Sequence, residues 1–253
     1  MNPGTSVAGQ DALPPGWAER RVPALRTLLH GLDDGRRSEV LNLAVQNRRC
    51  APGESIYRAG SPVSMLYALQ AGEAKSLIGT HRVAGYYLQG ELFGFAGLAA
   101  GAHIDDAVAC DTVDVAAMPY IELARLARDV PTLHRSLTRV LAVKLAPAPR
   151  RMETLAAGDA TAWVAHFLLQ LGERWSIRGQ PVRQFPLHVT NAEVGSLLGL
   201  TVDAVDDALA RLVRDGQIDR VGRTVLLLDV IALRRAASPV RTFGWGPSGK
   251  AIH

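Results

Sequence analysis

Residues 190–216, TNAEVGSLLGLTVDAVDDALARLVRDG, combine two helix-start signals with a run of carboxylates. Thr190 and Glu193 form a capping box, because each side chain can accept a hydrogen bond from the other residue's backbone N–H. Gly199 ends this first helix at a position that needs a positive φ, and Thr201 caps a second helix. Two short helices joined at a glycine are the layout of a helix-turn-helix, and also of two packed helices without any role in nucleic-acid binding.

The second helix of this pair separates apolar from acidic residues. Its apolar residues recur at helical spacing and are expected to face inward: Val205, Leu209 and Leu212. Asp203, Asp206 and Asp207 are not part of this apolar set, and the carboxylate of Asp203 can accept a hydrogen bond from cytosine N4. Over residues 201–219 five acidic residues stand against two basic ones. This charge balance is unfavourable for a surface that enters phosphate-walled grooves.

The elements around this pair complete a small mixed domain, residues 158–238. An amphipathic helix at Trp163–Leu171 precedes a strand-like segment at Gln184–Val189. After the two helices, Gly222 leads into a short β run at Thr224–Leu228, which is expected to form a wing. The last third of the chain therefore predicts a winged helix-turn-helix domain.

In an earlier unit, residues 25–118, glycine recurs every several residues between Pro52 and Ala117. Short apolar or alternating segments lie between the glycines: Met65–Leu69, Val83–Leu88 and Ala107–Met118. Short strands separated by turn residues are typical of an antiparallel sandwich or roll. We predict an antiparallel β-roll of the cupin-like jelly-roll kind, preceded by an amphipathic helix at Arg36–Gln46. With the C-terminal domain, the fold class is α+β.

A helical linker, residues 119–157, connects the two units. Tyr120–Arg128 suits a short helix, and Pro131 suits the first position of the next helix, where its missing N–H costs nothing. The apolar residues of that next helix recur at helical spacing: Leu133, Leu137, Val140, Leu141 and Leu145. Such a stripe needs a partner, either the β domain or a second copy of the chain. Pro147 and Pro149 interrupt the pattern, so we expect a kink or break there.

The composition is that of an ordinary globular protein. Of the 253 residues, 48% are apolar and 21% charged, which excludes wholesale disorder, a collagen-like repeat and a coiled-coil rod. The length favours two domains. No apolar run approaches the roughly 18 to 20 residues needed to cross a bilayer, and the N-terminus lacks a signal-peptide layout. We therefore expect a cytoplasmic protein without a membrane partner, with a flexible arm at residues 1–24 and a loose tail at residues 239–253.

Several segments resemble one known family. PGESIYRAG (52–60), MLYALQAGEAK (65–75) and GYYLQGELFGF (85–95) resemble the Gly-rich β-roll motifs of the CRP/FNR family of bacterial transcription regulators. The order of β-roll, long helix and winged helix-turn-helix is also that of the family, over roughly residues 30–235. The segment RWSIRGQPVRQFPLHVT (174–190) resembles the FNR branch more closely than the CRP branch. The resemblance implies a homodimer on double-stranded DNA, joined through the long helix with recognition helices in successive major grooves, and RNA polymerase as a further partner.

The chain also departs from this family. Proteins of the FNR type carry an iron–sulfur cluster on four cysteines, whereas this chain has two, Cys50 and Cys110, which excludes such a cluster on one chain. In the CRP branch an Arg-Ser pair holds the phosphate of cAMP, and Asp105 and Asp106 take that place here, where carboxylates repel a phosphate. We therefore expect no cAMP. We also expect no haem, because a lone histidine is more often a surface residue than a ligand, and we expect no metal. The residues matching the effector pocket are Gly90, Glu91, Leu92, Phe93, Gly94, Asp105 and Asp106.

The resemblance assigns DNA contacts to the second helix of the motif and its flanks. The family usually places Glu, Ser or Gly, and Arg on the groove-facing side, and the matching residues here are Asp203, Asp206 and Asp207. Asp207 therefore puts an acceptor where the family has a guanine-reading donor. The candidate DNA-contacting residues are Thr190, Thr201, Val202, Asp203, Asp206, Asp207, Arg211 and Arg223.

Two hypotheses follow. The first is a DNA-binding regulator with an altered base preference, supported by the capping box, the turn and the wing. The second is a dimeric family member that has lost sequence-specific DNA binding and acts as a ligand-sensing or partner-binding module, supported by the acidic helix and the prolines. A sister protein as dimer partner stays open. We expect no enzyme, because the sequence has no nucleophile elbow, no phosphate-binding glycine loop with its lysine, and no His–carboxylate cluster at metal spacing.

Overall fold

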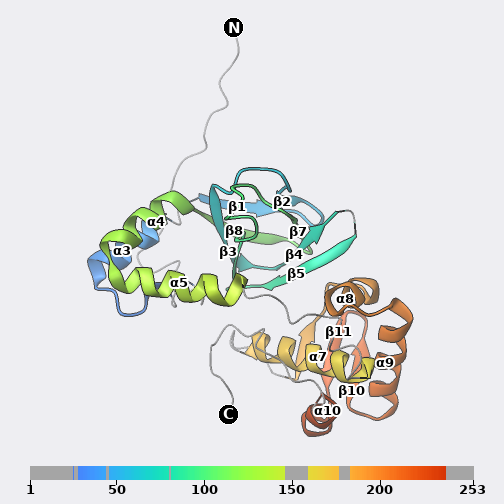
Figure 1. The fold of residues 1–253 in the computed structure, drawn as a ribbon. Helices are drawn as coiled ribbons and strands as arrows, with labels where there is room; N and C mark the ends of the chain where they lie inside the picture. The colour runs from blue at the N-terminus through green and yellow to red at the C-terminus, as the bar shows by residue number, and fades with distance from the viewer. Residues whose placement is uncertain are drawn as a thin grey trace.

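The computed structural model describes residues 25, 28–43, 46–79, 81–145, 159–176 and 183–237. It confirms the α+β class, with an antiparallel β domain, flanking helices and a C-terminal helix-turn-helix domain (Figure 1). The predicted arm, the predicted tail and the interruption at Pro147 and Pro149 lie outside these residues. No helix within the described ranges combines the length and apolar character that a membrane span requires.

Two four-stranded antiparallel sheets form the β-roll. The strand order is β1-β8-β3-β6 in one sheet and β2-β7-β4-β5 in the other. The strands are β1 (Gln46–Cys50), β2 (Ser55–Tyr57), β3 (Met65–Ala71), β4 (Glu73–Ile78), β5 (Arg82–Leu88), β6 (Leu92–Phe93), β7 (Asp106–Ala109) and β8 (Val113–Pro119). Buried residues of both sheets, among them Leu69, Val115 and Ala107, form one core cluster. The two sheets therefore bury their inner faces against each other.

The run Ala107–Met118, predicted as one extended segment, contains two strands in different sheets. β7 ends at Ala109 and β8 begins at Val113. Between them Asp111 Oδ1 accepts a hydrogen bond from the backbone N–H of Glu73 at 2.7 Å. This long-range contact fixes the crossing between the sheets, and apolar content alone does not reveal it.

Three helices, α3, α4 and α5, pack at one end of the β-roll (Figure 1). Their bounds are α3 (Asp34–Leu43), α4 (Tyr120–Asp129) and α5 (Pro131–Leu145). The start of α4 and the role of Pro131 as first residue of α5 are as predicted. The prediction Arg36–Gln46 for the first helix is shifted, because Asp33 Oδ1 accepts a hydrogen bond from the Arg36 N–H and so starts the helix earlier. Gln46 belongs to β1.

The C-terminal domain is a winged helix-turn-helix. Its elements are α7 (Ala160–Ser176), β9 (Gln184–Pro186), α8 (Asn191–Leu198), α9 (Val202–Arg214), β10 (Ile218–Val221), β11 (Thr224–Leu227) and α10 (Val230–Ala237). The three strands form a sheet in the order β10-β11-β9. The predicted wing strand is confirmed as β11, and its partner β10 was not predicted. β9 is shorter than the predicted Gln184–Val189, since Pro186 lacks a backbone donor.

The contact between the two domains is centred on β5, a strand of the β-roll. Val83, Tyr86 and Leu88 of this strand belong to the same apolar cluster as the buried residues of α7, α8 and α9. α8 lies next to β5, and α9 lies at the outer edge of the domain (Figure 1). The β-roll therefore holds the domain through α8 and α7 and leaves one face of α9 exposed.

Candidate nucleic-acid interface

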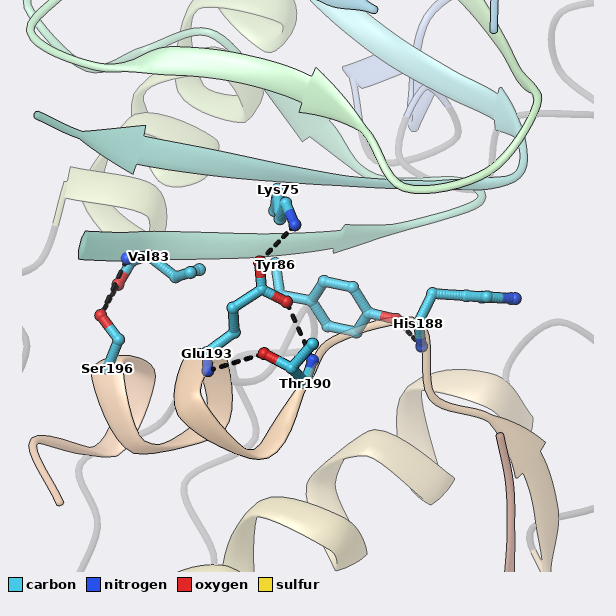
Figure 2. A network of polar contacts seen from close by, with 7 residues as sticks. All are labelled: Lys75, Val83, Tyr86, His188, Thr190, Glu193 and Ser196. Carbon is cyan, nitrogen blue, oxygen red and sulfur yellow. Dashed lines mark hydrogen bonds and ion pairs between the residues drawn. The ribbon is translucent and has the colours of Figure 1, made fainter. Parts of the chain in front are cut away.

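The predicted capping box starts α8. Thr190 Oγ1 accepts a hydrogen bond from the Glu193 N–H at 3.2 Å, and Glu193 Oε2 accepts one from the Thr190 N–H at 2.9 Å (Figure 2). Gly199 follows the helix with φ +72°, the left-handed conformation that the sequence required. The first helix and the turn are therefore confirmed.

α9 is amphipathic, with its acidic residues on the outside. Thr201 Oγ1 caps the helix by accepting a hydrogen bond from the Ala204 N–H at 3.2 Å. The predicted inward residues are buried: Val205, Leu209 and Leu212. Val202, Asp203, Asp206 and Asp207 are exposed. The exposed face of α9 thus presents three carboxylates in its first two turns.

The three carboxylates differ in their surroundings. Asp206 Oδ1 accepts a hydrogen bond from Asn191 Nδ2 at the start of α8. Asn191 Oδ1 accepts one at 3.4 Å from Arg220 Nη1 in the wing strand β10. Within the part of the chain that the structure describes, Asp203 and Asp207 make no hydrogen bond or ion pair. Asp206 is therefore held by the protein itself, whereas Asp203 and Asp207 can accept hydrogen bonds from a ligand.

Arginines surround the acidic face. Arg223, Arg220 and Arg214 are exposed at the wing turn, on β10 and at the end of α9. Arg211, predicted to contact DNA, makes an ion pair with Asp159 at the start of α7, with Nη1 2.8 Å from Oδ2. Exposed guanidinium groups can contact phosphate but do not by themselves read a base.

Three of the residues matched to an effector pocket already have partners within the protein. Glu91 pairs with Arg174 of α7, with Oε1 2.8 Å from Nε. Asp106 Oδ1 accepts a hydrogen bond from the Ala59 N–H at 2.9 Å. Asp105 is buried and accepts a hydrogen bond from the Tyr57 hydroxyl at 3.2 Å. Gly90 and Gly94 have positive φ and flank the buried residues Leu92 and Phe93.

Stacked aromatic rings fill the β-roll beside Asp105. The rings of Tyr57 and His103 lie 3.8 Å apart between centroids, and Phe93 stacks on Tyr67 at 5.5 Å and on Tyr87 at 4.9 Å. Sequence reasoning missed this group, although tyrosine in three separate β segments of a chain poor in aromatics was an available signal. Burial raises the pKa of Asp105 even though Ser76 and Tyr57 donate hydrogen bonds to it.

The stripe on α5 is divided between two environments. Leu133 and Leu137 are buried in the protomer's own core, in a cluster with Leu25, Leu28 and Leu29. Val140 and Leu141 are only partly buried, and the side chain of Leu145 lies outside the described residues. Of the two partners that the sequence left open, the β domain and its helices therefore take the first half of the stripe.

Comparison with known proteins identifies both domains. Residues 164–236 match the Crp-like helix-turn-helix domain, and residues 47–129 match the cyclic nucleotide-binding domain. The transcriptional activator protein Anr of Pseudomonas aeruginosa is 30% identical over 192 residues, which cover 74% of this chain and 79% of that protein. The chain belongs to the CRP/FNR family. The fumarate and nitrate reduction regulatory protein of Escherichia coli K12 is 27% identical over 204 residues, covering 79% of this chain and 82% of that protein.

Solved CRP/FNR structures have the same fold. FixK2 from Bradyrhizobium japonicum aligns with a TM-score of 0.65 at 24% identity, covering 76% of this chain and 96% of that one. A CRP-family transcriptional regulator from Thermus thermophilus aligns with a TM-score of 0.53 at 26% identity, with the same coverage. The CRP/FNR family consists of transcription regulators and not of enzymes, in agreement with the absence of an enzyme motif.

The residues of this family member do not fit a cyclic nucleotide. The buried Asp105 carboxyl stands where the family's phosphate-binding pair is expected, and the stacked rings occupy the adjoining interior. They do not fit an FNR-type iron–sulfur cluster either, since the sequence has two cysteines and such a cluster takes four. Burial raises the pKa of the Cys110 thiol to about 12, and Cys50 is fully buried in the β-roll core.

Proposed function

We propose that the chain is a homodimeric transcription regulator that places α9 in the major groove and reads a half-site different from the usual one of its family. The observation that carries this proposal is the exposed face of α9, a capped recognition helix with Asp203 and Asp207 unengaged by the described residues. The helix-turn-helix domain and the bacterial regulators similar to this chain support DNA binding itself.

Carboxylates on this face select for base-edge donors. In the major groove the exposed donors are cytosine N4 and adenine N6, and a carboxylate accepts well from cytosine N4. Asp203 also lies in the first turn of α9, where the helix dipole favours a negative charge. We therefore expect cytosine opposite Asp203 and Asp207, with the guanine-specific arginine contact of the family lost.

Affinity for the DNA backbone must come from other groups. Arg214, Arg220 and Arg223 surround the acidic face at its end and along the wing. The N-terminus of α8 also presents backbone donors toward a phosphate, as first helices of this motif do when they cross the backbone. We infer that these groups offset the repulsion between the aspartates and the phosphates.

Dimerisation supplies two recognition helices for a symmetric site. The partly exposed Val140 and Leu141 of α5 are the candidates for contact with a second copy, since Leu133 and Leu137 are buried in the protomer. We propose a homodimer acting in the bacterial cytoplasm, with RNA polymerase as a further partner. We propose that it works without an iron–sulfur cluster, cAMP or haem, as the poor fit of the first two supports.

The alternative, a family member that has lost sequence-specific DNA binding, is not favoured by the comparisons. Three of the similar proteins are named as transcriptional activators, and the match extends through the helix-turn-helix domain.

Selection of genomic DNA fragments by the purified full-length chain tests the proposal. The selection is run at about 50 mM and about 200 mM salt, because phosphate contacts alone weaken steeply over this range. We expect a symmetric site that is still recovered at the higher salt. Recovery only at low salt, or without a shared sequence, would contradict sequence-specific binding.

The double substitution Asp206→Ser and Asp207→Arg tests the assignment of α9. It restores the family's donor at the position of Asp207, so affinity for the usual family half-site should rise roughly 5- to 150-fold, the value of one bidentate arginine–guanine contact. Glu122→Gln on α4 is the matched control, because it also removes an exposed carboxylate and should leave affinity unchanged. No gain on that half-site would refute the assignment.

A further inference from the structure

The β-roll and the helix-turn-helix domain are joined by a buried pair of charges. Arg174 of α7 donates to Glu91 through Nε and Nη2, both at 2.8 Å, and its Nη2 also donates to the Tyr86 carbonyl at 2.6 Å. Arg174 and Glu91 are each 5% exposed. A charge pair removed from water this completely persists only while the two domains stay together.

α8 is attached to the β-roll by two further contacts. Lys75 of β4 pairs with Glu193, the same residue that completes the capping box, and the Val83 N–H of β5 donates to Ser196 Oγ at 2.8 Å (Figure 2). Val83 lies on an edge strand, since β5 pairs only with β4 among the described strands. Its amide therefore depends on the other domain for a partner.

A third carboxylate, Glu73, lies at the centre of this contact. It is 1% exposed, and Tyr86 donates its hydroxyl proton to Glu73 Oε2. Glu73 Oε1 lies 2.9 Å from Nδ1 of His188, in the segment between β9 and α8. Despite this short distance, neither Oε1 nor Nδ1 has a hydrogen-bond partner of regular geometry within the described ranges. A proton on Glu73 removes the uncompensated charge of this buried carboxyl.

We propose that these contacts form a proton-linked latch, in which Glu73 holds a proton while the domains are docked and gives it up as they part. The latch fixes the direction in which α9 is presented relative to the β-roll, and nothing in the established family membership assigns it.

The charges around Glu73 leave this proton as the balancing charge. On β4, Lys75 is matched by Glu193 of α8, and Glu91, after β5, is matched by Arg174 of α7. From the β7–β8 turn, Asp111 adds a negative charge, and the neighbouring Cys110 thiol stays neutral because burial raises its pKa. The remaining groups facing Glu73 are the Tyr86 hydroxyl and His188.

Titration of Glu73 gives the latch its pH dependence. Burial raises the pKa of Glu73 to about 7, although His188 acts in the opposite direction. Undocking exposes the carboxyl and returns its pKa to about 4.5, so the docked state binds the proton more tightly. Docking is therefore strongest at low pH and weakens as pH rises through 7. Glu193 does not oppose this pH dependence above pH 5. Burial raises the pKa of Glu193, but the hydrogen bond from Lys75 acts in the opposite direction, and the pKa is lowered overall.

Amide exchange at Val83 in the full-length chain measures docking directly. Protection is expressed as the ratio of intrinsic to observed exchange rates, which removes the effect of pH on exchange itself. We expect protection of the Val83 amide to fall about tenfold between pH 6 and pH 8, the change that a carboxyl with the two pKa values above produces. The Ala109 amide, which donates to Glu54 O within the β-roll, serves as internal control and should not change.

Three substitutions distinguish the latch from a general loss of structure. Glu73→Gln keeps the shape and cannot titrate, so protection at Val83 should become independent of pH. Lys75→Met removes the other ion pair and should lower protection at both pH values while keeping the tenfold ratio. His188→Gln should move the midpoint above pH 7, because His188 lowers the pKa of Glu73. A pH-independent Val83 amide in the parent chain, or an unchanged pH response in Glu73→Gln, would overturn the proposal.

Discussion

The helix-turn-helix motif and the contact between the two domains differ in how far apart in sequence their partners lie. Within the motif, Thr190 and Glu193 are three residues apart and Asn191 and Asp206 fifteen. Across the domain contact, Glu91 and Arg174 are 83 residues apart and Lys75 and Glu193 are 118 apart. The motif is therefore specified locally, whereas the domain contact exists only once both domains have folded.

This difference predicts a much larger energetic cost for breaking the domain contact than for breaking the motif's caps. Arg174→Met leaves Glu91 buried without its partner, so the free energy of unfolding should fall by about 3–5 kcal/mol in urea denaturation. The double variant Glu91→Gln with Arg174→Met removes both charges and should recover part of that loss. A single variant as stable as the parent would show that the pair does not hold the domains together.

The core beneath α9 should be the next most sensitive part. Leu212 is fully buried in the apolar cluster that the domains share, and Leu212→Ala should lower the free energy of unfolding by about 2–5 kcal/mol. Leu228→Ala removes the same side chain from an exposed site and should stay within about 0.5 kcal/mol of the parent. Thermal or urea unfolding compares the two variants, and equal losses would contradict the assignment of the buried face.

The smallest effect is expected at the cap of α9. Thr201→Ala removes the acceptor for the Ala204 N–H and should cost about 1 kcal/mol, whereas Thr201→Ser should be nearly neutral. Circular dichroism during urea unfolding measures both. If alanine and serine behave alike, the cap does not stabilise the helix.

The sequence predicted most of the local structure. The capping box at Thr190 and Glu193, the glycine turn at Gly199, the wing strand and the helix starting at Pro131 each depend on residues a few positions apart, and all are confirmed. The division of the α+β chain into β-roll and winged helix-turn-helix followed from the same local patterns.

The remaining features depend on contacts that periodicity does not encode. The split between β7 and β8 depends on a hydrogen bond from the Glu73 backbone to Asp111, and the shift of the first helix on the side chain of Asp33. Glu91 matched the family's pocket motif, but its ion pair with Arg174 was not visible in either local segment. Likewise, only the fold shows that Asn191 holds Asp206, while Asp203 and Asp207 have no hydrogen-bond or ion-pair partner among the described residues.

Base preference at the selected DNA site tests directly whether the α9 carboxylates read bases. Asp203→Asn, Asp206→Asn and Asp207→Asn each replace an acceptor with an amide, which pairs best with adenine. On the selected site with single-base changes, Asp203→Asn and Asp207→Asn should each shift one position from cytosine toward adenine by about 1–3 kcal/mol. Asp206→Asn should leave the preference unchanged, and Arg223→Ala should weaken all sequences equally. Unchanged base preference in both Asp203→Asn and Asp207→Asn would contradict reading by the acidic face.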